Sequence, residues 1–334
     1  MALDVKVIID MARTYGTLGF GYPLILVENA GSAVAYKEFA DISEVVSGGY
    51  AATTDAYKVA QLMFVQSHRP EKIAICSTSG KATEWLTDVN NMAKEWRQLV
   101  VISDTGTAST PLEIAKVIEA ATVEKMYYAN IDMPADIVSA TAISGISDYN
   151  RVVLFYYTPT EDIPCPVAAL AGAVGGLAPG SYTVNNLMLD GLEPYELSQT
   201  EIDAIHKLGG ITFILAAGDG VCSEGIVANG EYIDNIDGND YIKQQLEYKT
   251  QKVFNQNTKV PYTNAGIALL EAAAVGVMQD AQNKGIVDSY EIAYALREQV
   301  SAEDRAQRKY FGGSITYAMQ GAIHYIEIYC QAQV

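Results

Sequence analysis

The chain has 334 residues, of which 49% are hydrophobic and 19% are charged, a balance typical of a globular protein with room for about two domains. Acidic residues outnumber basic ones by 40 to 22, which gives a net charge of -18. Direct nucleic-acid binding is therefore not expected, because the chain has no surplus of lysine and arginine to replace counterions on phosphates. No apolar run reaches the length of about 18 residues that spans a membrane, so we expect no membrane insertion.

The N-terminal segment lacks the uninterrupted apolar run of a signal peptide, because Asp4, Lys6 and Asp10 interrupt it. Alternation predicts a strand over residues 4–11, followed by a glycine-rich loop. The four cysteines have neither zinc nor redox spacing, and this predicts synthesis in a reducing cytoplasm. They are Cys76, Cys165, Cys222 and Cys330.

Strand and helix patterns alternate over residues 24–157. Apolar runs predict strands, and these lie at residues 23–29, 72–77, 98–103, 125–130 and 151–158. Helices are predicted between these strands from helical periodicity or helix-capping residues. They lie at residues 53–67, 82–96, 109–121 and 134–142. This order is typical of a parallel sheet covered by helices.

A composition shift around residues 175–191, after a small-residue helix, predicts a domain boundary. Beyond it, Ser198 and Glu201 have the spacing of a capping box and predict a helix. A strand at residues 211–220, helices at 239–256, 263–285 and 288–300, a charged segment and terminal strands are expected next. The apolar part of the second of these helices is expected to be buried.

Three short motifs resemble known sites but lack essential residues. "CSTSGKA" has Ile75 where a phosphate-binding loop needs glycine and Ala82 where it needs a hydroxyl. "SDTG" resembles an aspartic protease loop, but the chain has no second copy. "DNIDGND" resembles a calcium loop, but Ile233 and Gln244 stand where carboxylates are required, so a solvated turn before the next helix is expected.

The three histidines, His68, His206 and His324, have no partners at metal-ligand spacing. A Gly-x-Ser-x-Gly elbow is also absent from the sequence. We therefore predict no catalytic residues, no metal site and no cofactor, although distant residues could still converge in the fold.

The end of the sequence, "GAIHYIEIYCQAQV", has an unusual pattern. Large apolar residues occupy odd positions up to Tyr325 and even positions from Ile326 to Val334. Because side chains alternate along a strand, the apolar set changes face near Tyr325, which predicts a bend and a last strand that joins another surface. The first and last strands could pair within one sheet, or each could add to a neighbouring molecule.

Several segments resemble the contractile tail sheath protein family of bacteriophages and R-type bacteriocin particles. "KVPYTNAGIALLEAAAVGVMQDAQNKGIV", "DRAQR" and "GAIHYIEIYCQAQV" are similar to the C-terminal domain of that family. "YKEFADISEVV" and "DAYKVAQLMFVQSHRPEKIAI" resemble its middle domain, which is subtilisin-like in fold without a catalytic triad. The chain lacks the extra outward-facing domains of larger sheath proteins, and this suggests a minimal sheath.

The resemblance implies an α/β middle domain and an α+β C-terminal domain, with β-strand arms at both ends that complete sheets in neighbouring subunits. The division we expect is an arm and linker at residues 1–20, a subtilisin-like domain at 21–190, a C-terminal sheath domain at 191–324 and an arm at 325–334. The residues expected to make inter-subunit strand contacts are Val5, Val7, Ile9 and Met11 at one end, and Ile326, Ile328, Cys330 and Val334 at the other.

The resemblance also implies a structural, non-enzymatic subunit that polymerises helically, in stacked hexameric rings, around a tail tube protein. Baseplate and tail terminator proteins would be further partners. The particle would assemble in the bacterial cytoplasm and act as a virion tail or an extracellular phage-like particle. Two alternatives remain open: an α/β hydrolase or nucleotide-binding enzyme with an unrecognised site, and a different self-assembling tail component.

Overall fold

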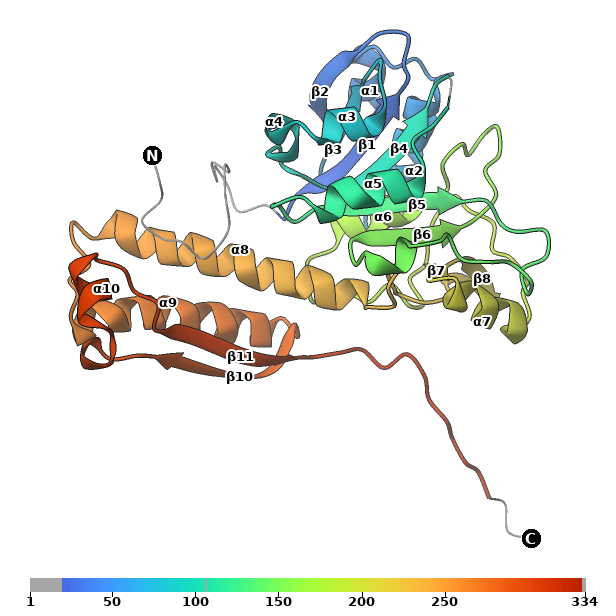
Figure 1. Cartoon of the computed structure of the whole chain (residues 1–334). Helices are drawn as coiled ribbons and strands as arrows, with labels where there is room; N and C mark the ends of the chain where they lie inside the picture. Colours follow the sequence, from blue (N-terminus) through green and yellow to red (C-terminus); the bar gives the residue numbers. More distant parts are fainter. Residues whose placement is uncertain (1–19, 106, 332–334) are drawn as a thin grey trace.

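The computed structural model describes residues 20–105 and 107–331. An α/β body forms one part of the molecule, and a long helix leads from it to a smaller helical and β-hairpin part (Figure 1). The strand predicted over residues 4–11 lies outside the described residues.

A seven-stranded sheet forms the centre of the body, in the order β2-β3-β1-β4-β5-β6-β7. All neighbouring strands are parallel except the edge strand β2, which runs antiparallel to β3. The strands are β1 (Tyr22–Glu28), β2 (Val34–Phe39), β3 (Ile73–Ser77), β4 (Trp96–Ser103), β5 (Met126–Ile131), β6 (Val152–Tyr156) and β7 (Gly210–Ile211). A parallel-rich sheet with this order is the α/β architecture that the strand and helix alternation predicts.

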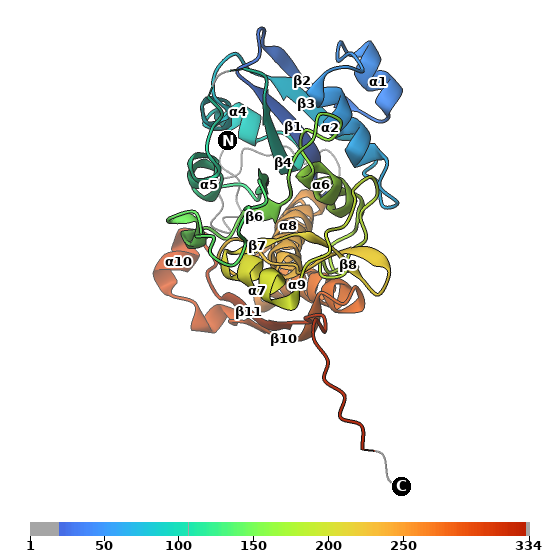
Figure 2. The same ribbon diagram turned by 90° about the vertical axis from the view of Figure 1, so that its right-hand side faces the viewer.

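Helices cover both faces of this sheet. Consecutive residues of β1 point to opposite sides, so Ile25 and Val27 join one apolar core while Leu24 and Leu26 join the other. Helices α2 and α6 pack in the first core and α3, α5 and α7 in the second (Figure 2). The body's helices are α1 (Ile42–Ser47), α2 (Asp55–Phe64), α3 (Ala82–Leu86), α4 (Val89–Met92), α5 (Pro111–Glu119), α6 (Val167–Gly176) and α7 (Gln199–Lys207), with a 3-10 turn at Ile146–Asp148.

Capping chemistry places two of these helices where the sequence predicts them. Thr110 and Glu113 form a capping box at the start of α5, with Pro111 as its first residue. Ser198 and Glu201 do the same for α7. Because β7 follows α7 and pairs with β6, the large sheet is completed only after residue 210, beyond the composition shift at residues 175–191.

Two predicted helices of the body differ in the structure. The helix expected over residues 82–96 is divided into α3 and α4, because Asp88 caps a new helix by accepting a hydrogen bond from the N–H of Asn90. The helix expected over residues 134–142 is wrong, since that segment forms turns and bends.

After a small hairpin, β8 (Phe213–Ala216) with β9 (Asp219–Cys222), the chain enters the smaller part. Helix α8 (Ile233–Gln256) leads out of the body, and α9 (Asn264–Asn283) packs back against it (Figure 1). An antiparallel pair, β10 (Val287–Tyr294) and β11 (Gly313–Met319), covers one side. Between the two strands lie a 3-10 turn, Arg297–Gln299, and α10 (Ala302–Ala306).

The helix predicted over residues 288–300 is wrong, because this segment begins as strand β10. Tyr290 and Ile292 alternate with exposed residues, and they pack with Ile315, Tyr317 and Met319 of β11 against the helices. The apolar residues of this segment therefore follow the two-residue period of a strand and not the 3.6-residue period of a helix, and pairing with β11 stabilises the strand. The one-sided pattern expected for residues 315–319 is confirmed.

Candidate assembly surfaces and the junction behind them

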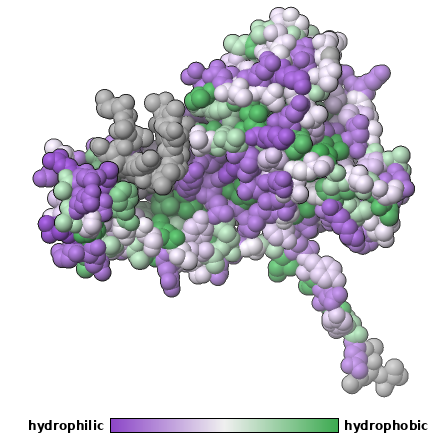
Figure 3. All heavy atoms as spheres, viewed as in Figure 1, coloured by the Kyte–Doolittle hydropathy of each residue, from purple (hydrophilic) through white to green (hydrophobic). Residues whose placement is uncertain are grey.

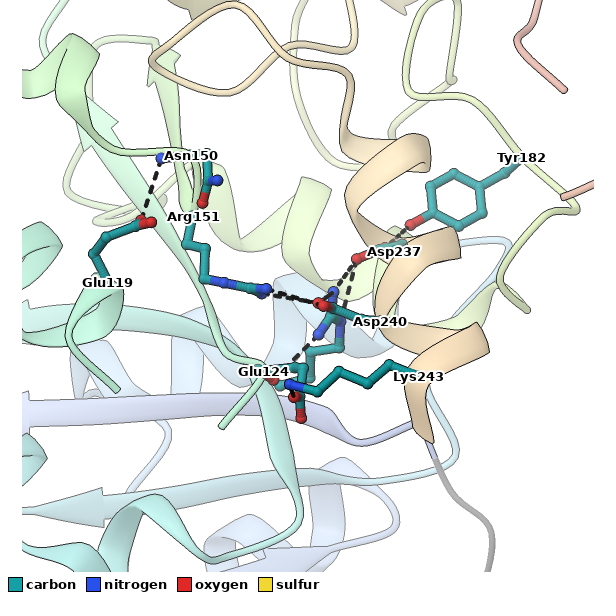
Figure 4. Close-up of polar contacts among 9 residues, drawn as sticks. Glu119, Glu124, Asn150, Arg151, Tyr182, Asp237, Asp240 and Lys243 are labelled. Atoms are coloured by element: carbon teal, nitrogen blue, oxygen red, sulfur yellow. Dashed lines mark hydrogen bonds and ion pairs between the residues drawn. The ribbon is translucent and has the colours of Figure 1, made fainter. Parts of the chain in front are cut away.

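A buried ionic cluster joins α8 to the sheet of the body (Figure 4). Arg97 of β4 is 2% exposed, and its guanidinium pairs with Asp237 and, at 2.8 Å, with Asp240 of α8. The same guanidinium donates to the carbonyl oxygen of Glu124, at 3.1 Å. The Tyr182 hydroxyl donates to the other oxygen of Asp237, so both oxygens of this buried carboxylate have partners.

Arg151, immediately before β6, makes a second link to the same helix. Its two terminal nitrogens donate to the two oxygens of Asp240, at 2.8 and 2.9 Å. Such a forked pair fixes orientation as well as distance. At the margin of the cluster, Lys243 lies 2.6 Å from Glu124. Three strands or strand ends therefore hold the first three turns of α8 against the body.

Electrostatics within the cluster favours the charged forms of Asp240 and Arg97 and the neutral form of Tyr182. Burial alone would raise the pKa of Asp240, but Arg97 and Arg151 outweigh it, and the pKa lies below the ordinary value. Burial would lower the pKa of Arg97, but Asp237 and Asp240 raise it. Burial and the negative charge of Asp237 raise the pKa of Tyr182 well above its usual value, so the phenol remains a donor.

The cluster corrects the prediction for "DNIDGND". That segment is not a solvated turn: it lies inside the first turns of α8, with Asp237 and Asp240 buried. A sequence signal existed, since both aspartates lie on the same helical face as Ile233, Ile236 and Tyr241. Acidic residues on an apolar helix face require buried cationic partners.

The ligand position typical of doubly wound folds is closed by a side chain of the protein. Such folds bind ligands beyond the carboxyl ends of the strands, where the strand order reverses, here around β1. Glu28, the last residue of β1, is fully buried there. Its carboxylate accepts hydrogen bonds from the N–H of Ala82, at 2.7 Å, and from the N–H and hydroxyl of Ser109, both at 2.6 Å. An internal carboxylate thus occupies the place of a ligand anion.

Replacing Glu28 by alanine is expected to lower the free energy of unfolding by about 2–4 kcal/mol, because buried N–H groups of Ala82 and Ser109 lose a charged acceptor. Urea unfolding followed by circular dichroism measures this change. Glu28→Gln, which keeps the size and one acceptor, should cost less. Equal loss in both variants would show that the carboxylate charge is not what holds this edge together.

The C-terminal segment beyond β11 leaves the molecule. Residues 320–331 have no regular structure. The segment contacts the body at His324, and residues 325–331 then project away from both parts (Figures 1 and 2). The large apolar side chains of this segment are exposed to solvent, from 73% at Ile326 to 89% at Tyr329. In Figure 3 this segment stands clear of the molecule and shows green, white and purple residues along its length.

This segment is extended, with alternating sides. The hydroxyls of Tyr325 and Tyr329 both donate to the carboxylate of Glu327, at 2.9 and 2.5 Å. These three residues therefore share one side, and Ile326, Ile328 and Cys330 have the opposite side. The structure leaves these three predicted contact residues exposed, while Val5, Val7, Ile9, Met11 and Val334 lie outside the described residues.

The polar and aromatic contacts of His324 are not predicted by the sequence. Its Nε2 lies 3.0 Å from the Thr183 hydroxyl, and its Nδ1 lies 2.6 Å from a carboxylate oxygen of Glu224. The Tyr232 ring packs edge-on against the imidazole. A single histidine in a strand-like run gives no spacing signal, because its partners come from three distant segments.

The smaller part also has open surfaces. Within the described residues, β10 and β11 pair only with each other, so each has a backbone edge without a strand partner. Helix α9 is less buried than expected, since Leu269 and Val275 are exposed on its outer side. Unpaired edges and apolar helix faces are surfaces on which another chain can pack.

Within residues 20–105 and 107–331, no group of three histidine, cysteine or acidic residues is placed to hold a metal ion. The helices of these ranges include none with the length and apolar character needed to cross a membrane.

No protein-family model matches this sequence, and no curated protein matches it. Solved structures do. The helical sheath of the anti-feeding prophage, in its contracted state, aligns with a TM-score of 0.72 and 12% identity over 94% of this chain and 93% of that chain. The contracted sheath of the PVC extracellular contractile injection system aligns with a TM-score of 0.71 and 12% identity, over 95% and 92%. A sheath tail protein from Listeria innocua aligns with a TM-score of 0.53 and 8% identity, over 92% and 97%.

The α/β body, the smaller part and their connection together therefore have the fold of contractile sheath proteins. The likeness extends over nearly the whole of both chains, and it confirms the sheath-like fold that the sequence resemblance predicts.

Proposed function

We propose that this chain is the structural subunit of a contractile sheath, which polymerises helically around a tail tube and drives that tube through a cell envelope on contraction. The observation that carries the proposal is the full-length likeness to two sheaths of contractile particles, combined with a projecting apolar C-terminal segment. A segment that buries little in its own molecule requires an acceptor elsewhere, and another subunit supplies one.

The finer features follow from this proposal. Residues 325–334 act as one arm and residues 4–11 as the other, and both add strands to sheets of neighbouring subunits. The unpaired edges of β10 and β11 are suitable acceptors, because a two-stranded sheet gains stability from further strands. Ile326, Ile328, Cys330 and Val334, with Val5, Val7, Ile9 and Met11, are the contact residues.

The body corresponds in this proposal to a subtilisin-like domain without a triad, and the part from α8 onward to the C-terminal sheath domain. The partners are further copies of this chain in stacked hexameric rings, a tube protein, and baseplate and terminator proteins. Assembly takes place in the bacterial cytoplasm, and the particle acts outside the cell or as a virion tail.

Contraction in this scheme requires no nucleotide. Each shared backbone hydrogen bond contributes only about 0.5–1.5 kcal/mol, but the links repeat in every subunit. The buried cluster around Arg97 and Asp237 keeps α8 and the body together as one unit while the arms maintain the mesh. Free energy comes from the larger contact area between subunits in the final state.

Negative-stain electron microscopy of the purified chain at increasing concentration tests the proposal, and hollow tubes are the expected result. Residues 1–232 hold 28 acidic and 13 basic residues, so neighbouring bodies repel one another. Tube formation should therefore increase from about 0.01 M to about 0.15 M salt, as the Debye length falls from about 30 Å to about 8 Å. Uniform small particles at every concentration and salt level would contradict self-polymerisation.

One set of contacts in the structure bears on the hydrolase alternative. Thr183, His324 and Glu224 have the contact order of a nucleophile, a base and a carboxylate. The histidine, however, belongs to a segment that leaves the body, and the threonine β-methyl hinders attack. Hydrolysis of a short-chain fluorogenic ester that disappears in Thr183→Val would favour the hydrolase, whereas equal background rates would exclude this triad.

A further inference from the structure

The C-terminal segment changes character at His324. Its side chain is 13% exposed, whereas Ile323 on one side is 86% exposed and Tyr325 on the other is 77% exposed. Beyond this residue, the hydrogen bonds of Tyr325 and Tyr329 stay within the segment. His324 is thus the place where the described part of this segment last inserts a side chain into the body.

Residues from three earlier places in the chain, all distant in sequence from His324, form the socket around its imidazole. Thr183 comes from the loop after α6, Glu224 follows β9, and Tyr232 precedes the first residue of α8. The root of the arm therefore lies at the point where α8 leaves the body. An arm held here leaves the subunit in a direction that is fixed relative to both parts.

We propose that His324 is the positioning residue of the C-terminal arm: its socket holds the root of the arm and sets the direction in which residues 325–331 leave the subunit. This inference rests on the proposed function, because a fixed direction matters only if the arm must reach a neighbour. A mobile root would give each arm several acceptors, and a rigid root selects one.

Contacts on several sides of the imidazole hold the root of the arm. Its Nε2 lies 3.0 Å from the Thr183 hydroxyl, and its Nδ1 lies 2.6 Å from the Glu224 carboxylate. Asp234 in the first turn of α8 also interacts electrostatically with His324. Polar groups of the body and of α8 therefore surround this one side chain.

His206 on α7 interacts with the same Glu224 and with Asp203, and it contacts the Ser223 hydroxyl at 3.1 Å. Burial lowers the pKa of His206, and the two carboxylates only partly oppose this. His206 therefore remains neutral to lower pH than an exposed histidine and leaves Glu224 available to His324.

Limited proteolysis with chymotrypsin measures the holding of the root directly. Cleavage after Tyr325 requires residues 322–325 to leave the socket and enter the protease, whereas cleavage after Tyr329 occurs on the free arm and serves as an internal reference. The ratio of the two initial rates, read by mass spectrometry at a concentration where the full chain is monomeric, cancels differences in protease activity between samples. In wild type this ratio should be low, because the socket protects the bond after Tyr325.

The variants separate the polar contacts of His324 from the bulk of its side chain. His324→Ala is expected to raise the ratio about threefold to tenfold, because the root of the arm loses its contacts in the socket. His324→Gln, which keeps a donor and an acceptor, should restore part of the protection, and Glu224→Gln should raise the ratio by less than His324→Ala does. His68→Gln, far along the chain from the arm, is the matched control and should behave as wild type.

A ratio unchanged in His324→Ala, or a rise of the same size in His68→Gln, would overturn the proposal. The measurement needs no polymer, so it stands apart from the electron microscopy of tubes. Tubes without a protected root would leave the sheath function intact and refute the positioning role. A protected root without tubes would do the reverse.

Discussion

Replacing Asp237 by alanine is expected to lower the free energy of unfolding by about 3–5 kcal/mol, because the change leaves Arg97 buried with one of its two acidic partners missing. It also removes the acceptor of the Tyr182 hydroxyl. Equilibrium urea unfolding at neutral pH measures the change. Asp288→Ala, which removes an exposed carboxylate from the same part of the chain, is the matched control and should change stability by no more than about 0.5 kcal/mol.

The cause of this loss can be isolated with a double-variant cycle. Arg97→Met combined with Asp237→Leu should cost less than the sum of the two single changes, since it removes the uncompensated buried charge together with its partner. Additive losses would show that packing volume, and not charge, holds α8 on the body.

The same cluster determines how the protein responds to acid. The folded-state pKa of Asp240 lies below its ordinary value, so its contribution is present above the unfolded-state pKa of about 3.9 and disappears as pH falls through the folded-state value. Wild-type protein should therefore lose stability below about pH 4 more steeply than Asp240→Asn, in which this linkage is absent. Parallel acid curves for the two proteins would contradict the assignment.

Local rules predicted most of the α/β body. Apolar runs marked the buried strands, and side-chain caps such as those of Thr110 and Ser198 fixed where helices begin. The sequence predictions are wrong where pairing with a segment distant in sequence determines the secondary structure. Asp288 and Glu291 have the spacing of a capping box, which favours a helix from residue 288, but pairing with β11 gives strand β10 a period of two. Periodicity within one segment cannot report the strand beside which that segment will lie.

The candidate functional residues likewise include some that the sequence singles out and others that only the fold brings together. Alternation in the sequence singles out Ile326, Ile328 and Cys330, and their role as contact residues stays a prediction, because both sides of the segment are exposed in the isolated chain. The Arg97–Asp237 pair and the Thr183–His324–Glu224 contacts join residues that are at least 100 positions apart in the chain. Only the fold brings such side chains together, so composition and spacing could not identify them.

Deleting residues 325–334 is expected to abolish tube formation while leaving the subunit as stable as wild type. Residues 325–331 are exposed, and their side-chain hydrogen bonds join Tyr325 and Tyr329 to Glu327 within the segment, so the monomer loses little. In a polymer, about five shared backbone hydrogen bonds would contribute roughly 3–7 kcal/mol per arm, enough to raise the concentration needed for assembly at least about a hundredfold. Sedimentation and electron microscopy measure assembly, and urea unfolding measures the stability of the subunit.

Ile328→Asp should reproduce the assembly defect, whereas Tyr329→Asp on the opposite side should cause a smaller defect, because the apolar side of the arm packs on the neighbour. Tubes of normal length from the truncated chain would rule out strand exchange through this arm.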